Sequence, residues 1–545
     1  MSQATVGKTS GGGEGHLKRE VGFWGLMFVS LGSIIGSGWL LGALLAAQVA
    51  GPASLVSWIM AGIFLAALAL VHAELGAAYP VSGGTARFPH FAFGSLAGFT
   101  CGWMAWLQAV TIAPIEVEAA LSYTNNKIHG LVNTKDATLT PTGLIVASVL
   151  MLLFTVVNIV GVKLLAESNT ITVLWKTAIP ILTVIVLIAL SFHSSNFTAG
   201  GGFAPFGAKG IMAALPAGVV FALQGFEQAI QVGGEAKNPQ KDIARAVIFA
   251  MIIGTILYLA LEVAFIGSLN PANLAKGWAN PIGKGDFGPY ATIATSIGAG
   301  WLAILLYIDA FISPAGTGLL YIGTSSRLSY ALGRNRYLPP VLSKVSPRGI
   351  PLFSVLLAFV VGEIAFLPFP SWQSLVGLVT SATAIMYAFA PISLGALRKS
   401  DPDRQRPYRL PMAGIISPFS FIAANYIVYW SGWEADQKLF LAIIVGVILF
   451  AGYFATMSPE RRPIMDFRSS AWVGPWLIGL AIITKLGQFG GTNTIPFWWD
   501  LGIMAIFALV IYYVGVHLAM DTAKVHAAVE EEEFEAAVEP DLAVG

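Results

Sequence analysis

Long apolar runs, separated by short polar or glycine- and proline-containing segments, recur along almost the whole chain. A helix that crosses the hydrocarbon core of a bilayer needs about 20 mostly apolar residues. The runs that meet this requirement cover residues 22–48, 52–79, 96–124, 142–161, 166–192, 210–232, 243–269, 289–332, 351–369, 373–397, 412–431, 438–457, 472–488 and 501–520. The thirteenth run is the weakest, because it is short and ends in Lys485. The pattern predicts an all-α integral membrane protein with 12–14 transmembrane spans.

The composition supports a membrane protein and argues against several other classes. Of 545 residues, 56% are hydrophobic and only 11% are charged, whereas an ordinary soluble domain is about 25% charged. The formal net charge of +1 offers little attraction for phosphates, so we expect no nucleic-acid partner. The single cysteine, the spacing of the seven histidines and the lack of a P-loop motif give no sign of a metal, a cofactor or an ATP-driven step.

Positive charge is distributed unevenly between the two sides that these spans would create. Lys and Arg concentrate in the cytoplasmic segments of membrane proteins. With the N-terminus inside, the outer side would hold only Lys127, Lys135, Lys209, Lys276, Lys284, Lys438 and Lys485. We therefore expect a multi-pass protein of the cell (plasma) membrane with both termini cytoplasmic. Residues 1–20 form one predicted tail, without a signal-peptide pattern, and the acidic residues 521–545 form a second, disordered one.

Two spans contain residues that weaken a continuous helix. The first has Gly32, Gly36 and Gly38 at its middle, and each glycine costs a helix about 1 kcal/mol relative to alanine. The sixth has Gly225 between polar side chains. Unwound backbone inside a membrane is tolerated only where it lines a cavity or is buried in protein. Close helix packing through small residues is the alternative explanation. Two interrupted helices five spans apart, however, are typical of the binding site of a transporter built from inverted repeats.

At these residues the chain resembles bacterial amino acid permeases of the amino acid–polyamine–organocation superfamily. The resemblance implies a transport core of two inverted five-helix repeats over residues 21–400, with broken helices 1 and 6, and peripheral transmembrane helices over residues 401–520. The matching motifs are the segment 32–38, Ala73-Glu74-Leu75-Gly76-Ala77-Ala78-Tyr79-Pro80, Ser82-Gly83-Gly84, Gly225-Phe226-Glu227, Gly234-Glu235-Ala236-Lys237-Asn238-Pro239, Ser326-Arg327-Leu328-Ser329-Tyr330-Ala331 and Arg406-Pro407-Tyr408-Arg409-Leu410-Pro411.

Further motifs are similar to the aspartate–proton symporter branch of this superfamily. They are Trp39-Leu40, Ile115-Glu116-Val117, Phe203-Ala204-Pro205-Phe206-Gly207, Asp309-Ala310, Leu367-Pro368-Phe369-Pro370-Ser371-Trp372 and Tyr429-Trp430-Ser431-Gly432-Trp433. This resemblance implies proton-coupled uptake of an amino acid, with L-aspartate as the expected substrate. A few changes in a pocket can switch the substrate within one fold, so another amino acid, small and neutral or glutamate, stays open. An integral-membrane enzyme or a channel is a weaker alternative, because the sequence shows neither a nucleophile–base pair nor a filter motif.

Ionisable side chains at membrane depth are candidates for function by default. Lys176 lies in mid-span, and the resemblance implies a position near the unwound part of helix 1, where a lysine that gains and loses a proton would replace sodium. Its alternative role is a structural ammonium that caps free carbonyls. Asp309, Glu116 and Glu227 are further candidates for proton coupling, each with a purely structural alternative.

The broken helices are expected to bind the substrate. Free N–H groups suit its α-carboxylate and free carbonyls suit its ammonium group. The predicted substrate-binding residues are Ser33, Ile34, Ile35, Gly36, Ser37, Gly38, Phe221, Gln224, Gly225 and Phe226. Lys176 is the nearest candidate for the side-chain carboxylate of aspartate. The expected partners are therefore an amino acid, protons and the lipid bilayer.

Overall fold

The computed structural model describes residues 21–81, 84–160, 162–233, 236–283, 288–346, 350–367, 371–459, 462–463 and 465–538, with the side chains of 162–170 and 532–538 left out. Within these ranges every regular element is a helix, and the only bridges of β type are isolated pairs. The motif residues Ser82-Gly83, Gly234-Glu235 and Pro368-Phe369-Pro370 and the predicted tail 1–20 lie outside the described residues.

Each of the fourteen predicted spans coincides with helical structure, so the predicted fold class is confirmed. By length and composition, ten of the described helical segments can cross a membrane. Twelve of the predicted spans correspond to α3 (Ser54–Ala78), α5 (Ser95–Asn125), α6 (Pro141–Val160), α7 (Val162–Leu190), α11 (Pro239–Ser268), α14 (Gly300–Arg334), α15 (Leu352–Ala365), α16 (Trp372–Ser400), α17 (Ala413–Ser431), α18 (Trp433–Thr456), α19 (Val473–Leu486) and α20 (Phe497–His517).

The first and sixth predicted spans are each divided into shorter helices. The first consists of α1 (Phe23–Ile34) and α2 (Gly38–Ala50). The sixth consists of α8 (Gly207–Ala214), a π-helical turn (Leu215–Val219), α9 (Val220–Leu223) and α10 (Gln228–Gln231). The predicted single span 289–332 is also divided, into α13 (Pro289–Ser296) and α14, because Gly298 takes a positive φ of 81° between them.

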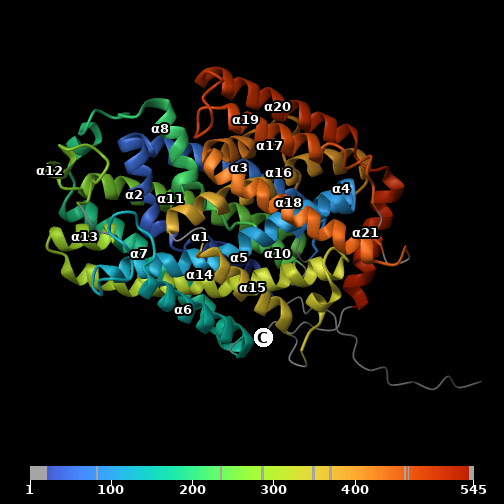
Figure 1. Ribbon diagram of the computed structural model, residues 1–545, viewed down its shortest axis with the longest axis horizontal. Helices are drawn as coiled ribbons and strands as arrows, with labels where there is room; N and C mark the ends of the chain where they lie inside the picture. Colours follow the sequence, from blue (N-terminus) through green and yellow to red (C-terminus); the bar gives the residue numbers. More distant parts are fainter. Residues whose placement is uncertain are drawn as a thin grey trace, which may run out of the picture.

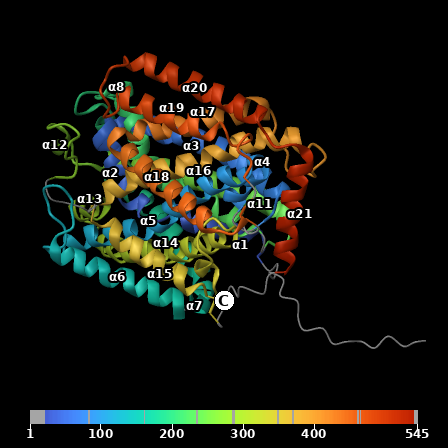
Figure 2. The same cartoon turned by 45° about the vertical axis from the view of Figure 1, so that its right-hand side comes forward.

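The helices form an inner group and an outer layer (Figures 1 and 2). In α5 and α16, 94% of the most apolar window is buried in the protein, compared with 28% in α6 and 22% in α18. The exposed side chains of α6, α18 and α20 are largely aliphatic and aromatic, which suits contact with lipid. The inner helices therefore shield the middle of each interrupted span from the surrounding membrane.

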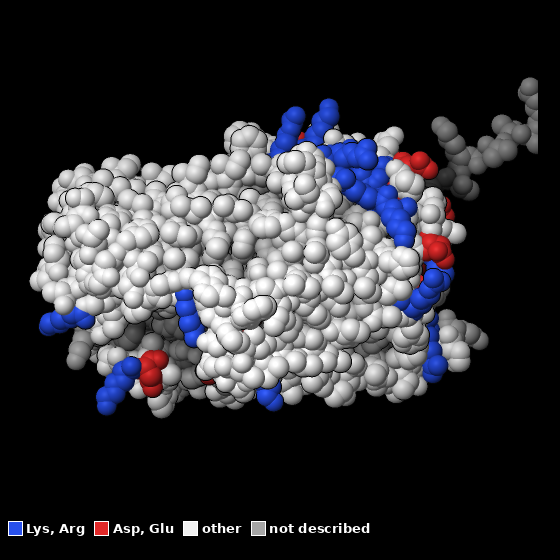
Figure 3. All heavy atoms as spheres, turned by 90° about the horizontal axis from the view of Figure 1, so that it is seen from above, with Lys and Arg blue, Asp and Glu red and all other residues white. Residues whose placement is uncertain are grey.

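Positive side chains gather at one end of the molecule. In Figure 3 most of the visible Lys and Arg lie at the end that carries α4 (Gly84–Phe93) and α21 (Thr522–Val538) in Figure 1. Fewer lie at the opposite end, which carries α12 (Pro271–Leu274) and α13. This is the kind of asymmetry on which the positive-inside rule rests.

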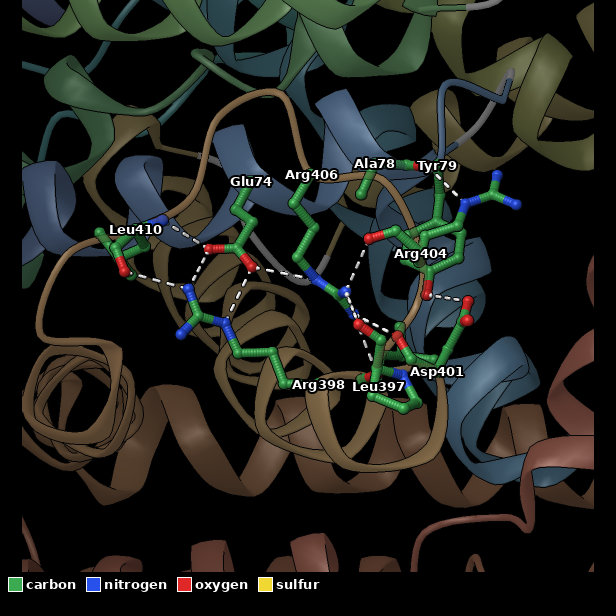
Figure 4. Close-up of polar contacts among 10 residues, drawn as sticks. Glu74, Ala78, Tyr79, Leu397, Arg398, Asp401, Arg404, Arg406 and Leu410 are labelled. Carbon is green, nitrogen blue, oxygen red and sulfur yellow. Dashed lines mark hydrogen bonds and ion pairs between the residues drawn. The ribbon is translucent and has the colours of Figure 1, made fainter.

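A buried ion cluster ties α3 to α16 at the positive end (Figure 4). The fully buried carboxylate of Glu74 accepts hydrogen bonds from Arg398 Nε (2.9 Å) and Nη2 (2.5 Å) and from the backbone N–H of Leu410 (2.6 Å). The guanidinium of Arg406 lies 3.3 Å from the same carboxylate. Two guanidinium groups around one buried carboxylate satisfy its charge and fix the segment that follows α16.

The predicted disorder of the acidic tail is wrong for residues 522–538, which form α21. Val525 and Val529, one helical turn apart, are buried against the body of the protein. Lys524 pairs with Asp466 at 2.7 Å, and the His526 ring lies 3.2 Å from Asp401. An apolar pair at helical spacing, flanked by these polar contacts, therefore holds a segment whose acidic composition alone indicates a solvated chain.

The ion cluster predicts a stability effect. We expect Glu74→Gln to lower the unfolding temperature in detergent micelles by several degrees, because it leaves two guanidinium groups without their buried partner, a change that costs about 3–5 kcal/mol. Differential scanning fluorimetry of the purified protein measures this change. Glu434→Gln is the matched control, since Glu434 is 87% exposed and lies 3.7 Å from Lys438; we expect an effect within about 0.5 kcal/mol. Equal unfolding temperatures for the two variants would contradict the assignment.

Candidate substrate and proton-coupling site

The first interrupted span unwinds at residues 35–37, here called the first break. Helix α1 ends at Ile34 and α2 begins at Gly38. A Cβ atom on Gly36 would lie 2.7 Å from Glu116 Oε1 and 3.0 Å from Thr317 Oγ1. Only a residue without a side chain therefore lets the polar groups of α5 and α14 approach this backbone.

The second break covers residues 224–227, between α9 and α10. Gln224 is extended, with ψ of 161°, and Gly225 has a φ of 117°, which disfavours any residue with a Cβ. The carboxylate of Glu227 accepts hydrogen bonds from the Gly225 N–H (3.0 Å) and from the Tyr387 hydroxyl (2.5 Å). Glu227 therefore stabilises the bend, which is the structural alternative that the sequence left open.

The two breaks lie against one another. A Cβ atom on Gly225 would come within 2.5 Å of Ser33 Oγ and 3.0 Å of the Ile34 nitrogen. On the other side of the first break, a Cβ on Gly38 would lie 2.7 Å from the Ala222 Cα. The Ser30 hydroxyl donates to the Phe226 carbonyl at 2.8 Å. Unwound backbone from both spans is thus gathered in one buried place.

A carboxylate occupies the free N-terminus of α2. Glu116 Oε2 accepts a hydrogen bond of 2.8 Å from the backbone N–H of Ser37. The N-terminal end of a helix carries unpaired N–H groups and a partial positive charge, and so favours an anion. This is the place that the sequence predicted for the α-carboxylate of the substrate, and a protein carboxylate holds it in this structure.

Lys176 binds the other side of the first break. Its buried ammonium donates to the Gly32 carbonyl and to Thr317 Oγ1, each at 2.7 Å. The resemblance placed Lys176 near the unwound part of helix 1, and the structure has it there. The capping role also agrees with this geometry, with Gly32 as the capped carbonyl.

Asp309 is held by neutral donors. Its carboxylate accepts hydrogen bonds from Trp175 Nε1 (2.8 Å), Trp39 Nε1 (3.2 Å) and the Ser313 hydroxyl (2.8 Å). Asp309 and Lys176 are not within ion-pair distance of one another among the described salt bridges. Of the other predicted pocket residues, Phe221 packs edge-to-face on Trp372, whose indole donates to Ser37 Oγ at 2.9 Å.

A polar stripe on α14 is the part of the site that sequence reasoning missed. Asp309, Ser313, Thr317 and Tyr321 follow one another at intervals of four and face the same group of helices. Of these four residues, the sequence singled out only Asp309 as a candidate. Thr317 bonds Lys176, and the Tyr321 hydroxyl lies 2.8 Å from Ser33 Oγ. The four-residue spacing of polar side chains in an apolar span was the available signal.

Comparisons with known proteins decide the family. A family model described as amino acid permease matches residues 21–458. The chain belongs to this family. The permease is 36% identical over 508 residues to the glutamate/serine transporter AimA of Bacillus subtilis. The matched region covers 91% of this chain and 93% of the relative. The permease is 37% identical over 507 residues to the aspartate-proton symporter of the same organism, covering 92% and 96%.

More distant relatives have other names. The permease is 25% identical over 469 residues to the branched-chain amino acid permease BcaP of B. subtilis, covering 83% of this chain and 96% of the relative. These relatives are transporters, so the permease is not an enzyme, and amino acid transport through a multi-pass membrane protein is its function class. The resemblance found in the sequence motifs is therefore confirmed at the level of the family.

The contact between the breaks predicts that a single added methyl group will slow transport strongly. We expect Gly225→Ala to reduce the initial rate of amino acid uptake by roughly tenfold or more, because the added Cβ meets Ser33 and a non-glycine residue at this φ costs about 1–3 kcal/mol. Uptake of radiolabelled aspartate, glutamate and serine into proteoliposomes gives the rate per reconstituted protein.

Gly414→Ala is the matched control for this variant. A Cβ on Gly414, in α17, would meet no atom within 4 Å. We expect its uptake rate to equal that of the unchanged permease. A Gly225→Ala permease with an unchanged rate would show that the contact between the breaks is not needed for transport.

Proposed function

We propose that the permease imports L-aspartate together with protons by alternating access. The observation that carries this proposal is the placement of one buried ammonium and one buried carboxylate on the same break: Lys176 on the Gly32 carbonyl and Glu116 on the Ser37 N–H. The relative named aspartate-proton symporter supports both the substrate and the coupled ion.

In the proposed cycle, Glu116 and the substrate compete for one donor. The ionised Glu116 carboxylate holds the Ser37 N–H at the N-terminus of α2. A proton taken up by Glu116 removes the charge that the helix end favours and weakens this contact. The α-carboxylate of the amino acid then takes the vacated N–H. Proton binding and substrate binding thus favour one another, which is the coupling that symport requires.

Lys176 would contribute to coupling at the other side of the first break. Its ammonium joins α7 to the end of α1 through Gly32 and to α14 through Thr317. Release of its proton would remove a charged donor from the Gly32 carbonyl and loosen α1 from these two helices. Asp309 and Glu227, which are bonded to neutral donors, are the proposed carriers of a second proton.

Accumulation of an acidic substrate requires a co-transported positive charge, which in our proposal is a proton. Aspartate carries one net negative charge at neutral pH, and moving one charge against the membrane potential costs about 2.3 kcal/mol per 100 mV. One proton cancels that charge, and a pH gradient or a second proton then drives accumulation. We place the permease in the plasma membrane with both termini cytoplasmic, in keeping with the gathering of Lys and Arg at the end that carries α21.

Transport into sodium-free proteoliposomes tests the proposal. We expect an imposed pH gradient, alkaline inside, to drive accumulation of labelled aspartate. Lys176→Ala should lower this accumulation by roughly tenfold or more, within the range that a coupling free energy of about 1–3 kcal/mol implies. Glu116→Gln, which imitates the protonated side chain, should retain exchange of internal for external aspartate but lose its dependence on the pH gradient.

Lys438→Ala is the control, since Lys438 lies at the start of α18 and its side chain is 36% exposed. It should behave as the unchanged permease. Normal pH dependence in Lys176→Ala and in Glu116→Gln would refute the coupling scheme, and a requirement for sodium would refute proton symport.

A second candidate function is the transport of glutamate and serine, or of a small neutral amino acid. The relative named glutamate/serine transporter favours it, with almost the same identity over almost the same length. Competition of unlabelled glutamate, serine and alanine against labelled aspartate in the same vesicles separates the two candidates.

A further inference from the structure

A buried amide donor without a partner lies beside the two breaks. Gln108 projects from α5 and is 2% exposed. Its Nε2 makes no hydrogen bond among the described residues. Most buried polar side chains are paired, and an unpaired buried donor costs about 1–3 kcal/mol. A site that keeps such a donor in an apolar span is suited to a ligand that completes the bond.

The surroundings of Gln108 connect it to the first break. Its side chain lies near the hydroxyl of Tyr321, as does that of Gln228, but its Nε2 does not reach that hydroxyl with the geometry of a hydrogen bond. The same hydroxyl lies 2.8 Å from Ser33 Oγ, next to Ile34 and the first break. The Gln228 amide oxygen accepts a hydrogen bond of 3.2 Å from Thr324. Four elements, α1, α5, α10 and α14, thus contribute polar groups to one buried cluster, in which the Gln108 amide nitrogen is the unpaired donor.

Other donors in the region are already engaged. Lys176 donates to Gly32 and Thr317, and the indoles of Trp39 and Trp175 donate to Asp309. Gln108 is therefore a second candidate, besides Lys176, for the group that binds the side chain of the substrate. Gln224 Oε1, in the second break, is the complementary case: a buried acceptor without a partner among the described residues, which suits an ammonium group.

We propose that Gln108 is a specificity-determining residue whose Nε2 donates a hydrogen bond to the side-chain oxygen of the transported amino acid. The proposal rests on the function proposed above, because it places the α-carboxylate and ammonium at the breaks and the side chain towards Gln108. It assigns the substrate to amino acids with an oxygen acceptor in the side chain, a class that includes the acidic ones, serine, threonine, asparagine and glutamine. An apolar side chain leaves Nε2 unpaired and is rejected for that reason.

The test compares substrates that differ only in the acceptor. The inhibition constants of unlabelled aspartate, serine and alanine are measured against labelled aspartate, or against labelled serine, in proteoliposomes. We expect Gln108→Leu to raise the inhibition constants of aspartate and serine by roughly 10- to 100-fold, the value of a hydrogen bond to a polar or charged ligand group. Alanine, which has no side-chain acceptor, should change by less than about threefold, within the usual scatter of such contributions.

A second variant guards against a general loss of folding or activity. Gln108→Glu keeps the size and polarity of the side chain, but its carboxylate repels an acidic substrate and still accepts from a hydroxyl. We expect this variant to lose the binding of aspartate selectively and to retain the binding of serine. Gln437→Leu, at an exposed position of α18, is the matched control and should leave all three constants unchanged.

The outcomes separate this inference from the function on which it rests. Unchanged discrimination between serine and alanine in Gln108→Leu, in a permease that takes up aspartate with protons, would overturn the role of Gln108 and leave the proposed function intact. Uptake of serine but not aspartate by the unchanged permease, with discrimination lost in Gln108→Leu, would overturn the proposed substrate and support Gln108. An equal loss of binding for all three substrates in both variants, with normal unfolding temperatures, would also overturn the role of Gln108.

Discussion

The lack of water in the hydrocarbon core of a membrane is the constraint on which the rest of this structure depends. A backbone N–H or C=O that leaves its helix there must find a partner in the protein. At the two breaks these partners are side chains: Glu116 for the Ser37 N–H, Lys176 for the Gly32 carbonyl and Tyr258 for the Ile34 carbonyl, at 2.7–2.8 Å. At the second break, Ser30 donates to the Phe226 carbonyl and Glu227 accepts from the Gly225 N–H. The broken helices exist because other helices complete their hydrogen bonds.

This constraint links structure to the proposed coupling. Neutral side chains could satisfy the free backbone groups, yet two of the partners carry ionisable groups of opposite sign. A proton that arrives at or leaves such a partner changes a hydrogen bond to the break itself, so the local geometry depends on protonation. In our proposal the substrate supplies the missing partner, which is why proton and amino acid move together.

The remainder of the permease positions these contacts. α5 and α14 carry Glu116, Gln108, Thr317 and Tyr321 to the breaks, and their close packing excludes lipid from the site. The Glu74 cluster fixes α3 against α16 at the positive end, and α21 packs beside it through His526 and Asp401. The outer helices α18 and α20 contribute mainly apolar surface. Rigid surroundings of this kind let a small change at a break alter the packing of whole helices.

The sequence by itself determined where the long apolar helices lie, their membrane character and the two interrupted spans, because length, apolar composition and glycine content act locally. It also singled out Lys176, Glu116 and Asp309 as candidates for function, since a charge in an apolar run is conspicuous. The tertiary structure alone decided which group binds which. The Lys176 ammonium donates to the Gly32 carbonyl, and the Tyr387 hydroxyl donates to the Glu227 carboxylate, because partners more than a hundred residues apart meet only when the helices pack. Gln108 was invisible for the same reason: an amide in a span is ordinary until the packing leaves its donor unpaired.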